Sequence, residues 1–190
     1  AARAPSRDPS TLAVFRVGRD AAGSVARAVR VPEQEYAKLE GPAAIFILRR
    51  ASGNPWTGQF PYVDLTNPDT ARLFIQTTYE TYKRHVGEEF GKTIKYAFDD
   101  EPLLATAGAY EQGELALPLS YNTLAEFRQR NGYDLRDELP SLFWDVGEWR
   151  KVRFDYWQTL HDLWKENYFR PIFQWCDHNN LPVSYTHLRA

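Results

Sequence analysis

The stretch KYAFDDEPLL, residues 95–104, decides how this chain is interpreted, because an apolar run ends there in three adjacent carboxylates. The run, residues 94–98, is short and carries Ile, Tyr and Phe, which is typical of a buried strand. The carboxylates of Asp99, Asp100 and Glu101 follow at the carboxyl end of that strand. In parallel sheets and barrels, ligands and catalytic groups gather at this end. The stretch therefore predicts a strand of an α/β fold with a site at its end.

Alternation along the strand predicts which side chains share a face. Asp99 and Glu101 lie on the same side as Ala97, whereas Asp100 lies on the same side as Phe98. We expect the bulky apolar side to pack against helices. The side of the small Ala97 would then open toward a ligand, with the carboxyl groups of Asp99 and Glu101 pointing together into the site.

Pro102 fixes the backbone of the residue before it. A residue that precedes proline is driven out of the α region, so the backbone of Glu101 is extended in advance, which helps to place a carboxyl group for proton transfer. Repulsion from Asp99 and Asp100 favours the protonated form of Glu101, as a general acid requires. The alternative is that Asp99 and Asp100 cap the following segment or pair with Lys or Arg, and that Glu101 is solvated.

Composition excludes several classes of function. The 190 residues are 43% hydrophobic and 25% charged, as in ordinary soluble globular proteins, and fit one domain or part of a larger one. A net charge of -2 argues against nucleic acid as a partner, and no apolar run reaches the roughly 18 residues of a membrane span. The single cysteine, Cys176, excludes an internal disulfide framework, and the four histidines have no metal-ligand spacing.

The rest of the chain alternates strand and helix patterns. Residues 12–17 and 25–31 flank a glycine-containing turn and predict a β-hairpin, and the continuous apolar run 43–48 suits a strand buried on both faces. Helices are predicted over residues 68–86, 120–130, 135–143 (broken at Pro140) and 148–179 (kinked or split at Pro171). This order predicts parallel strands joined by crossovers, the α/β class.

The two ends of the sequence predict a piece of a longer polypeptide. The chain contains no methionine, and no charged-then-apolar leader opens it. Residues 183–190 are either a genuine strand or a non-native, adapter-derived tail. We therefore expect the remainder of the same polypeptide to be needed to complete the fold.

Several motifs occur in an order that resembles one enzyme family. They are Trp56, YVDLTNP (62–68), FGKTI (90–94), FDDEP (98–102), NGYDL (131–135), LPSLF (139–143), FDYW (154–157) and ENYF (166–169). Over roughly residues 43–181, this order resembles the bacterial α-L-rhamnosidase-like glycoside hydrolases of the family 106 type.

The resemblance implies a partial (β/α)8, or TIM-type, barrel over residues 41–182. Residues 1–40 would form an N-terminal segment with the β-hairpin, and residues 183–190 the tail. The implied function is that of a glycosidase that hydrolyses carbohydrate side chains of polysaccharides or glycoconjugates, in the periplasm or secreted.

The resemblance also implies that Glu101 is a catalytic carboxylate. The motif reads FTDEP in relatives, so Asp99 replaces a threonine and adds a charge, while Asp100, Glu101 and Pro102 are kept. Enzymes of this type are expected to invert configuration, which requires a second carboxylate about 6.5–9.5 Å away. In the family it comes from a later barrel strand. Some relatives place calcium near the sugar hydroxyls, and Asp99 and Asp100 are candidate ligands for such a hard cation.

Three residues of the loop after the strand at 43–48 are further candidates for sugar binding. Trp56 and Tyr62 offer aromatic faces on which the C–H faces of a sugar ring can pack, although they can equally anchor the loop itself. Asp64 either hydrogen-bonds sugar hydroxyls or braces the start of the next helix beside Asn67.

Two other functions stay open. The chain could belong to a non-catalytic carbohydrate-binding module derived from such a barrel, which would bind sugar without turnover. It could also belong to a retaining glycosidase of a neighbouring barrel family, and the anomeric configuration of the first product would separate that enzyme from an inverting one.

Overall fold

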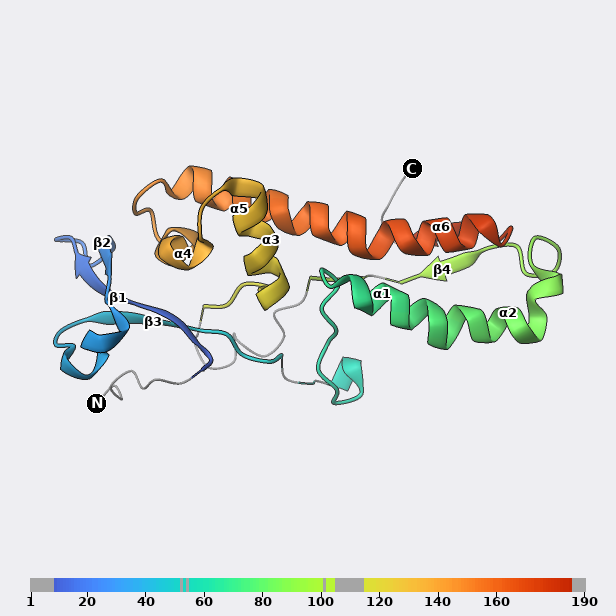
Figure 1. Cartoon of the computed structure of the whole chain (residues 1–190), viewed down its shortest axis with the longest axis horizontal. Helices are drawn as coiled ribbons and strands as arrows, with labels where there is room; N and C mark the ends of the chain where they lie inside the picture. Colours follow the sequence, from blue (N-terminus) through green and yellow to red (C-terminus); the bar gives the residue numbers. More distant parts are fainter. Residues whose placement is uncertain (1–8, 52, 54, 101, 105–114, 186–190) are drawn as a thin grey trace.

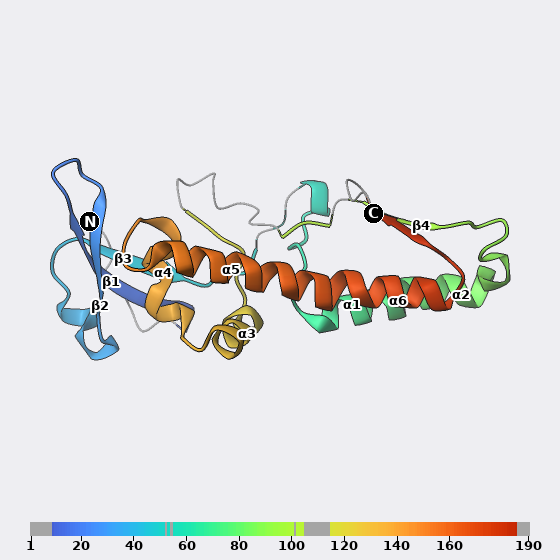
Figure 2. The ribbon, with the colours of Figure 1, turned by 90° about the horizontal axis from the view of Figure 1, so that it is seen from above.

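The computed structural model describes residues 9–51, 53, 55–100, 102–104 and 115–185. Figure 1 shows an elongated molecule with a small antiparallel sheet at one end and a helical layer with a short parallel strand at the other. One long helical stretch, which contains α5 Trp149–Trp164 and α6 Arg170–His178, spans both ends (Figures 1 and 2). These residues form a mixed α/β fold with two small sheets and no closed barrel. The finer prediction, a partial (β/α)8 barrel, stays a proposal.

The antiparallel sheet has the strand order β2-β1-β3. Its strands are β1 Thr11–Arg19, β2 Val25–Arg30 and β3 Ala43–Ile47. The predicted hairpin is confirmed, and the side chain of Asp20 closes its turn by accepting from the backbone N–H groups of Ala22 and Ser24.

The environment predicted for residues 43–48 is wrong. The strand β3 is antiparallel to β1 and lies at the edge of the sheet, with the side chains of Ile45 and Ile47 exposed. An apolar run indicates burial but does not reveal which segment covers it, so the sequence could not distinguish a central parallel strand from an edge strand.

The helix predicted over residues 68–86 is confirmed as one continuous stretch. It consists of α1 Pro68–Phe74, the π-helical turn η3 Ile75–Tyr79 and α2 Glu80–Val86. Asn67 caps its start, because its side chain accepts from the backbone N–H of Asp69, and a short 3-10 turn, η4 Gly87–Glu89, follows.

Two shorter helices come later in the chain, and they are α3 Tyr121–Asn131 and α4 Leu135–Phe143. Ser120 caps α3 through the N–H of Thr123, and Gly132, at φ 79°, ends it in the left-handed conformation. The predicted break at Pro140 is wrong, since α4 runs through it. Pro140 lies near the end of the helix, where a single backbone hydrogen bond is lost and its ring is buried.

The long helix predicted over residues 148–179 contains an irregular turn just before its proline. It consists of α5 Trp149–Trp164, the π-helical turn η6 Lys165–Phe169 and α6 Arg170–His178. Pro171 has no N–H to donate, and its ring crowds the carbonyl of Asn167, four residues earlier. That carbonyl lies within the π-helical turn η6, whose wider backbone accommodates the ring. Figure 2 shows that the helix continues through this turn.

The second sheet pairs β4 Ala97–Asp99 with β5 Val183–Tyr185 in parallel, with Ala97 opposite Val183 and Asp99 opposite Tyr185. The predicted parallel pairing is therefore present for these two strands, whereas β3 belongs to the antiparallel sheet. Residues 183–185 form a strand, and the interpretation of residues 183–190 as an adapter-derived tail stays a prediction. The predicted start of the first strand at Ile94 is wrong, because Ile94 belongs to a turn in which its carbonyl accepts from the N–H of Gly91.

Each end of the molecule is stabilised by an apolar cluster of its own. The first joins β1 to α3, α4 and α5 and contains Ala13, Phe15, Leu124, Phe127, Leu135, Leu139, Val152, Tyr156 and Leu160. The second joins α1 to η6 and α6 and contains Leu65, Ala71, Tyr168, Ile172 and Cys176.

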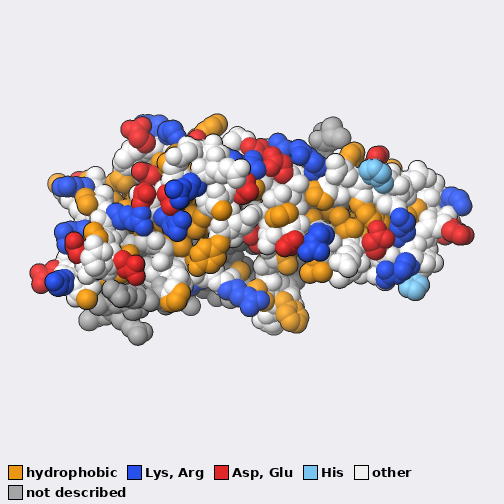
Figure 3. Space-filling model, in the orientation of Figure 1, with side chains coloured by type: hydrophobic (Ala, Val, Ile, Leu, Met, Phe, Trp, Pro, Cys, Tyr) orange, Lys and Arg blue, Asp and Glu red, His pale blue; other side chains and the backbone are white. Residues whose placement is uncertain are grey.

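Figure 3 shows charged side chains of both signs among hydrophobic ones on the face in view. None of the helices within the described ranges is long and apolar enough to cross a membrane.

Candidate functional site

Asp99 is the last residue of β4 and lies half-buried beside the long helix. Its Oδ2 accepts a hydrogen bond from the hydroxyl of Tyr168 at 3.0 Å. The pKa of the Asp99 carboxyl is raised above its usual value. Burial is the largest cause and the charge on Asp100 adds to it, whereas the hydrogen bond from Tyr168 lowers the pKa and offsets part of this shift. The strand end therefore holds a carboxylate whose environment favours its protonated form.

The two faces of β4 are reversed relative to the prediction. Ala97 packs against the apolar cluster of the helices and Asp99 contacts Tyr168, whereas Tyr96 and Phe98 are 65% and 60% exposed. Large aromatic side chains already fill the helix layer, so only a small residue fits beneath the strand. Asp100 is exposed at the strand end and lies on the same open face of β4 as Phe98. The sequence had predicted that Asp99 would lie on the open face.

Two π-helical turns border Asp99 from neighbouring helices. Tyr79 ends the turn η3 and Tyr168 belongs to the turn η6. Burial, then Cys176 and Asp99, raise the pKa of Tyr79 to about 12. Burial and the charge of Asp99 likewise raise the pKa of Tyr168 and bring that of Cys176 to about 11. The titratable groups of these helices that act on Asp99 are therefore neutral at pH 7.

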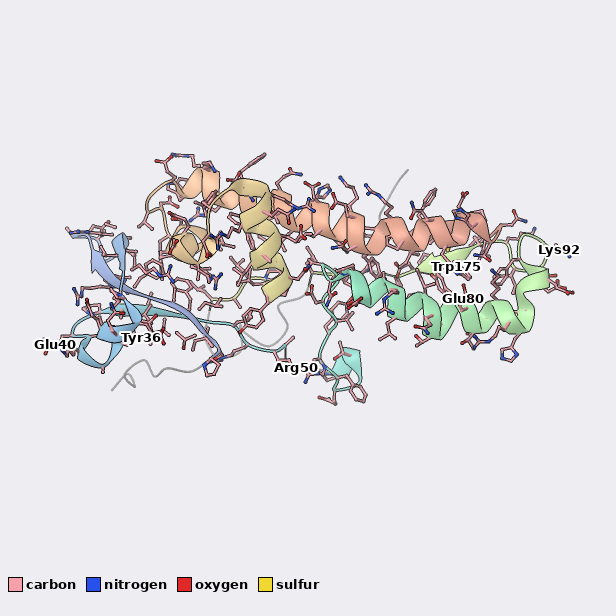
Figure 4. The ribbon with its side chains drawn as sticks, in the orientation of Figure 1. Tyr36, Glu40, Arg50, Glu80, Lys92 and Trp175 are labelled. Atoms are coloured by element: carbon pink, nitrogen blue, oxygen red, sulfur yellow. The ribbon has the colours of Figure 1, made fainter. Side chains whose placement is uncertain are left out.

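A side-chain hydrogen bond ties the two helices together farther from the strand end. The indole Nε1 of Trp175 donates to Oε1 of Glu80 at 2.6 Å, and Figure 4 shows this pair between α6 and α2. The ring of Trp175 also lies 5.0 Å from that of Tyr79. This contact helps to fix the helix layer on which β4 rests.

Tyr62 and Asp64 are two of the three predicted site residues in the loop after β3, and the structure describes the side chains of both. The hydroxyl of Tyr62 accepts from the backbone N–H of Leu103 at 3.3 Å, which links this loop to the segment after β4. Asp64 braces the helix start: its Oδ1 accepts from the N–H and the hydroxyl of Thr66, and its carbonyl accepts from the hydroxyl of Thr70. The bracing interpretation is confirmed, and sugar binding by Asp64 stays a prediction.

Thr66 is the centre of a buried set of polar contacts that the sequence did not predict. Its hydroxyl lies 3.2 Å from that of Thr123, and its carbonyl accepts from the side-chain amides of Asn122 at 3.0 Å and Asn167 at 2.7 Å. Asn122 and Asn167 lie 56 and 101 residues away along the chain. No local pattern in the sequence indicates such partners.

A cavity of about 950 Å³ lies between the sheet and the helices. Tyr62 and Asp64 line it together with apolar residues that include Ile45, Leu104 and Leu160. Its volume is in the range of small-molecule sites, which are mostly apolar with a few polar groups. The loop of Tyr62 thus borders both this cavity and the segment after β4.

Some of the predicted site lies outside the described residues. Glu101 is one such residue, and of Trp56 only the backbone is described, in the 3-10 turn η2 Pro55–Thr57. Within the part of the chain that is described, no group of three or more His, Cys, Asp or Glu side chains is arranged to hold a metal ion. Calcium binding by Asp99 and Asp100 stays a prediction.

Comparison with solved structures finds similarity to a rhamnosidase from Novosphingobium sp. PP1Y. The sequence identity is 22% and the TM-score 0.49, over 66% of this chain and 12% of that one. The present chain thus spans a small part of the length of that enzyme. No protein-family model matches the sequence, and no curated protein is significantly similar to it.

Proposed function

We propose that this chain is part of a glycoside hydrolase of the α-L-rhamnosidase-like group, with a partial (β/α)8 barrel, that hydrolyses glycosidic bonds in carbohydrate side chains. The observation that carries the proposal is the pair of carboxylates, Asp99 and Asp100, at the carboxyl end of a parallel strand. In parallel α/β folds, this end of the sheet supplies the ligand-binding and catalytic groups. The ordered motifs from Trp56 to ENYF at 166–169 support the assignment to this group.

In this proposal Glu101 is the catalytic acid. It follows Asp100 directly, and Pro102 restrains its backbone to an extended conformation. In an inverting hydrolysis, such an acid protonates the leaving oxygen while a second carboxylate activates water on the opposite side of the sugar. The remainder of the polypeptide would supply that second carboxylate and complete the barrel.

Sugar binding is assigned to the strand end and to the neighbouring loop. Asp100 is exposed and suited to accept hydrogen bonds from sugar hydroxyls, whereas Asp99 accepts from Tyr168. Tyr62 and Trp56 would supply aromatic surfaces, and Asp64 a further carboxylate. If calcium takes part, Asp99 and Asp100 would provide oxygen ligands of the kind that this cation prefers.

The test is the hydrolysis of an aryl α-L-rhamnoside by the complete polypeptide that contains this chain. The variant Glu101→Gln should lower kcat by about 10²–10⁴-fold, the usual contribution of a general acid. Glu88→Gln, in the exposed turn η4, is the matched control and should leave kcat unchanged. A Glu101→Gln variant with nearly wild-type kcat would remove Glu101 from the mechanism.

The cavity favours a second candidate, a carbohydrate-binding module without hydrolytic activity. Its volume of about 950 Å³ suits a small ligand, and Tyr62 and Asp64 line it. This function predicts that calorimetry detects rhamnose binding by the wild type and by Glu101→Gln alike, while neither protein releases the aryl group.

A further inference from the structure

The π-helical turn η6 contacts the loop that precedes α1 and the end of strand β4. Asn167 donates from its side-chain amide to the carbonyl of Thr66 at 2.7 Å, and the next residue, Tyr168, donates from its hydroxyl to Asp99 at 3.0 Å. Adjacent residues of a regular helix point about 100° apart, since 3.6 residues make one turn. Asn167 and Tyr168 diverge in this turn as well, and they reach two different segments, the one just before α1 and the end of β4. π-helical turns occur frequently at functional sites.

Tyr168 is itself held firmly. Its side chain is 8% exposed and belongs to the apolar cluster of α1 and α6, and its ring lies 5.4 Å from that of Phe169. A carboxylate partly removed from water is costly unless hydrogen bonds compensate it. Because packing fixes the side chain of Tyr168, its hydroxyl holds the carboxyl group of Asp99 in one orientation. Groups at functional sites need such support from neighbouring residues.

We propose that Tyr168 is a positioning residue of the proposed hydrolase, holding the Asp99 carboxyl and with it the end of β4 that leads into Asp100 and Glu101. This inference rests on the proposed function. Tyr168 acts through Asp99 and does not touch the sugar.

The hydrogen bond also influences the ionisation of Asp99. The described titratable groups that act on Asp99 include Tyr168, Tyr79 and Cys176, which are neutral at pH 7, and Asp100, whose charge raises the pKa of Asp99. Within this set, the hydroxyl of Tyr168 is the group that stabilises the ionised form of Asp99. Loss of the hydroxyl should therefore raise the pKa of Asp99 further above its usual value.

The experiment compares Tyr168→Phe with Tyr133→Phe in the complete polypeptide, assayed on an aryl α-L-rhamnoside between pH 4 and 8. Tyr133 is the matched control, because its hydroxyl also donates to a carboxylate, Asp155, at 2.8 Å, away from β4. Tyr168→Phe should lower kcat/KM about tenfold or more and move the acid limb of its pH profile to higher pH. Tyr133→Phe should change neither.

A second variant separates positioning from stability. Asp99→Asn keeps an oxygen for Tyr168 but cannot titrate, so Tyr168→Phe should cause no further shift of the pH profile in that background. A Tyr168→Phe enzyme that is active with an unmoved pH profile would overturn the inference while leaving the proposed function intact, even if its melting temperature falls. A wild-type polypeptide that does not cleave the rhamnoside would overturn both.

Discussion

Replacing Thr66 with valine removes one hydroxyl from the buried contacts that hold the loop after β3. The side chain of Thr66 is 2% exposed, and its hydroxyl donates to Oδ1 of Asp64 at 2.6 Å and lies 3.2 Å from the hydroxyl of Thr123. Valine has nearly the same shape, and the carbonyl that accepts from Asn122 and Asn167 stays in place. The substitution therefore tests the hydroxyl alone.

The expected loss in the free energy of unfolding follows from the two contacts of the Thr66 hydroxyl, with Asp64 and with Thr123. A hydrogen bond to a charged group contributes about 1.5–3 kcal/mol and one between neutral groups about 0.5–1.5 kcal/mol. Asp64 keeps its bond from the N–H of Thr66, and Thr123 keeps its contact with Ser120 at 3.0 Å. We therefore expect Thr66→Val to lower the free energy of unfolding by about 2–3 kcal/mol.

The assay is urea unfolding of the chain followed by tryptophan fluorescence, with an unchanged m-value as the condition for comparing variants. Thr81→Val is the matched control, because the hydroxyl of Thr81 donates to the carbonyl of Thr77 on an exposed helix face. It should change the free energy of unfolding by less than about 0.5 kcal/mol. Equal effects of the two substitutions would refute the reasoning.

Three further predictions concern pH, packing and the thiol. The folded pKa of Asp99 lies above its unfolded value of 3.8, so the contribution of Asp99 to stability should fall as pH rises from 3.8 through the folded pKa. In urea melts, the stability of the wild type relative to Asp99→Asn should therefore decrease over this pH window. Leu160→Ala, at a side chain 1% exposed, should cost about 2–5 kcal/mol in the same melts, whereas Leu73→Ala, 55% exposed, should cost far less. Cys176 is fully buried with a pKa of about 11, so Ellman's reagent at pH 8 should label it only as fast as the chain opens.

The sequence predicted best those structural features that depend on residues close together in the chain. The caps at Asn67 and Ser120 and the end of α3 at Gly132 depend on side chains and backbone within a few positions, and all three are present in the structure. The hairpin likewise depends on its own turn. Helix periodicity was equally informative, because one apolar stripe is enough to indicate a buried face.

The sequence predicted poorly what distant segments determine. The faces of β4 are reversed because aromatic residues such as Tyr79 of η3, Tyr168 of η6 and Trp175 of α6 share the apolar cluster with Ala97 and leave room only for a small side chain of the strand. No pattern within the strand reveals this. The burial of β3 depends on its place at the edge of a sheet. At the candidate site, the acidic strand end was predicted, but its partner Tyr168, 69 residues away, was not.

The most direct test of the proposed hydrolysis is proton NMR of the complete polypeptide acting on an aryl α-L-rhamnoside. The account predicts that rhamnose is released and that the first product has the β configuration, because an inverting pair of carboxylates delivers water from the face opposite the leaving group. A first product of α configuration would contradict the inverting mechanism, and an unchanged substrate would contradict the proposed hydrolysis itself.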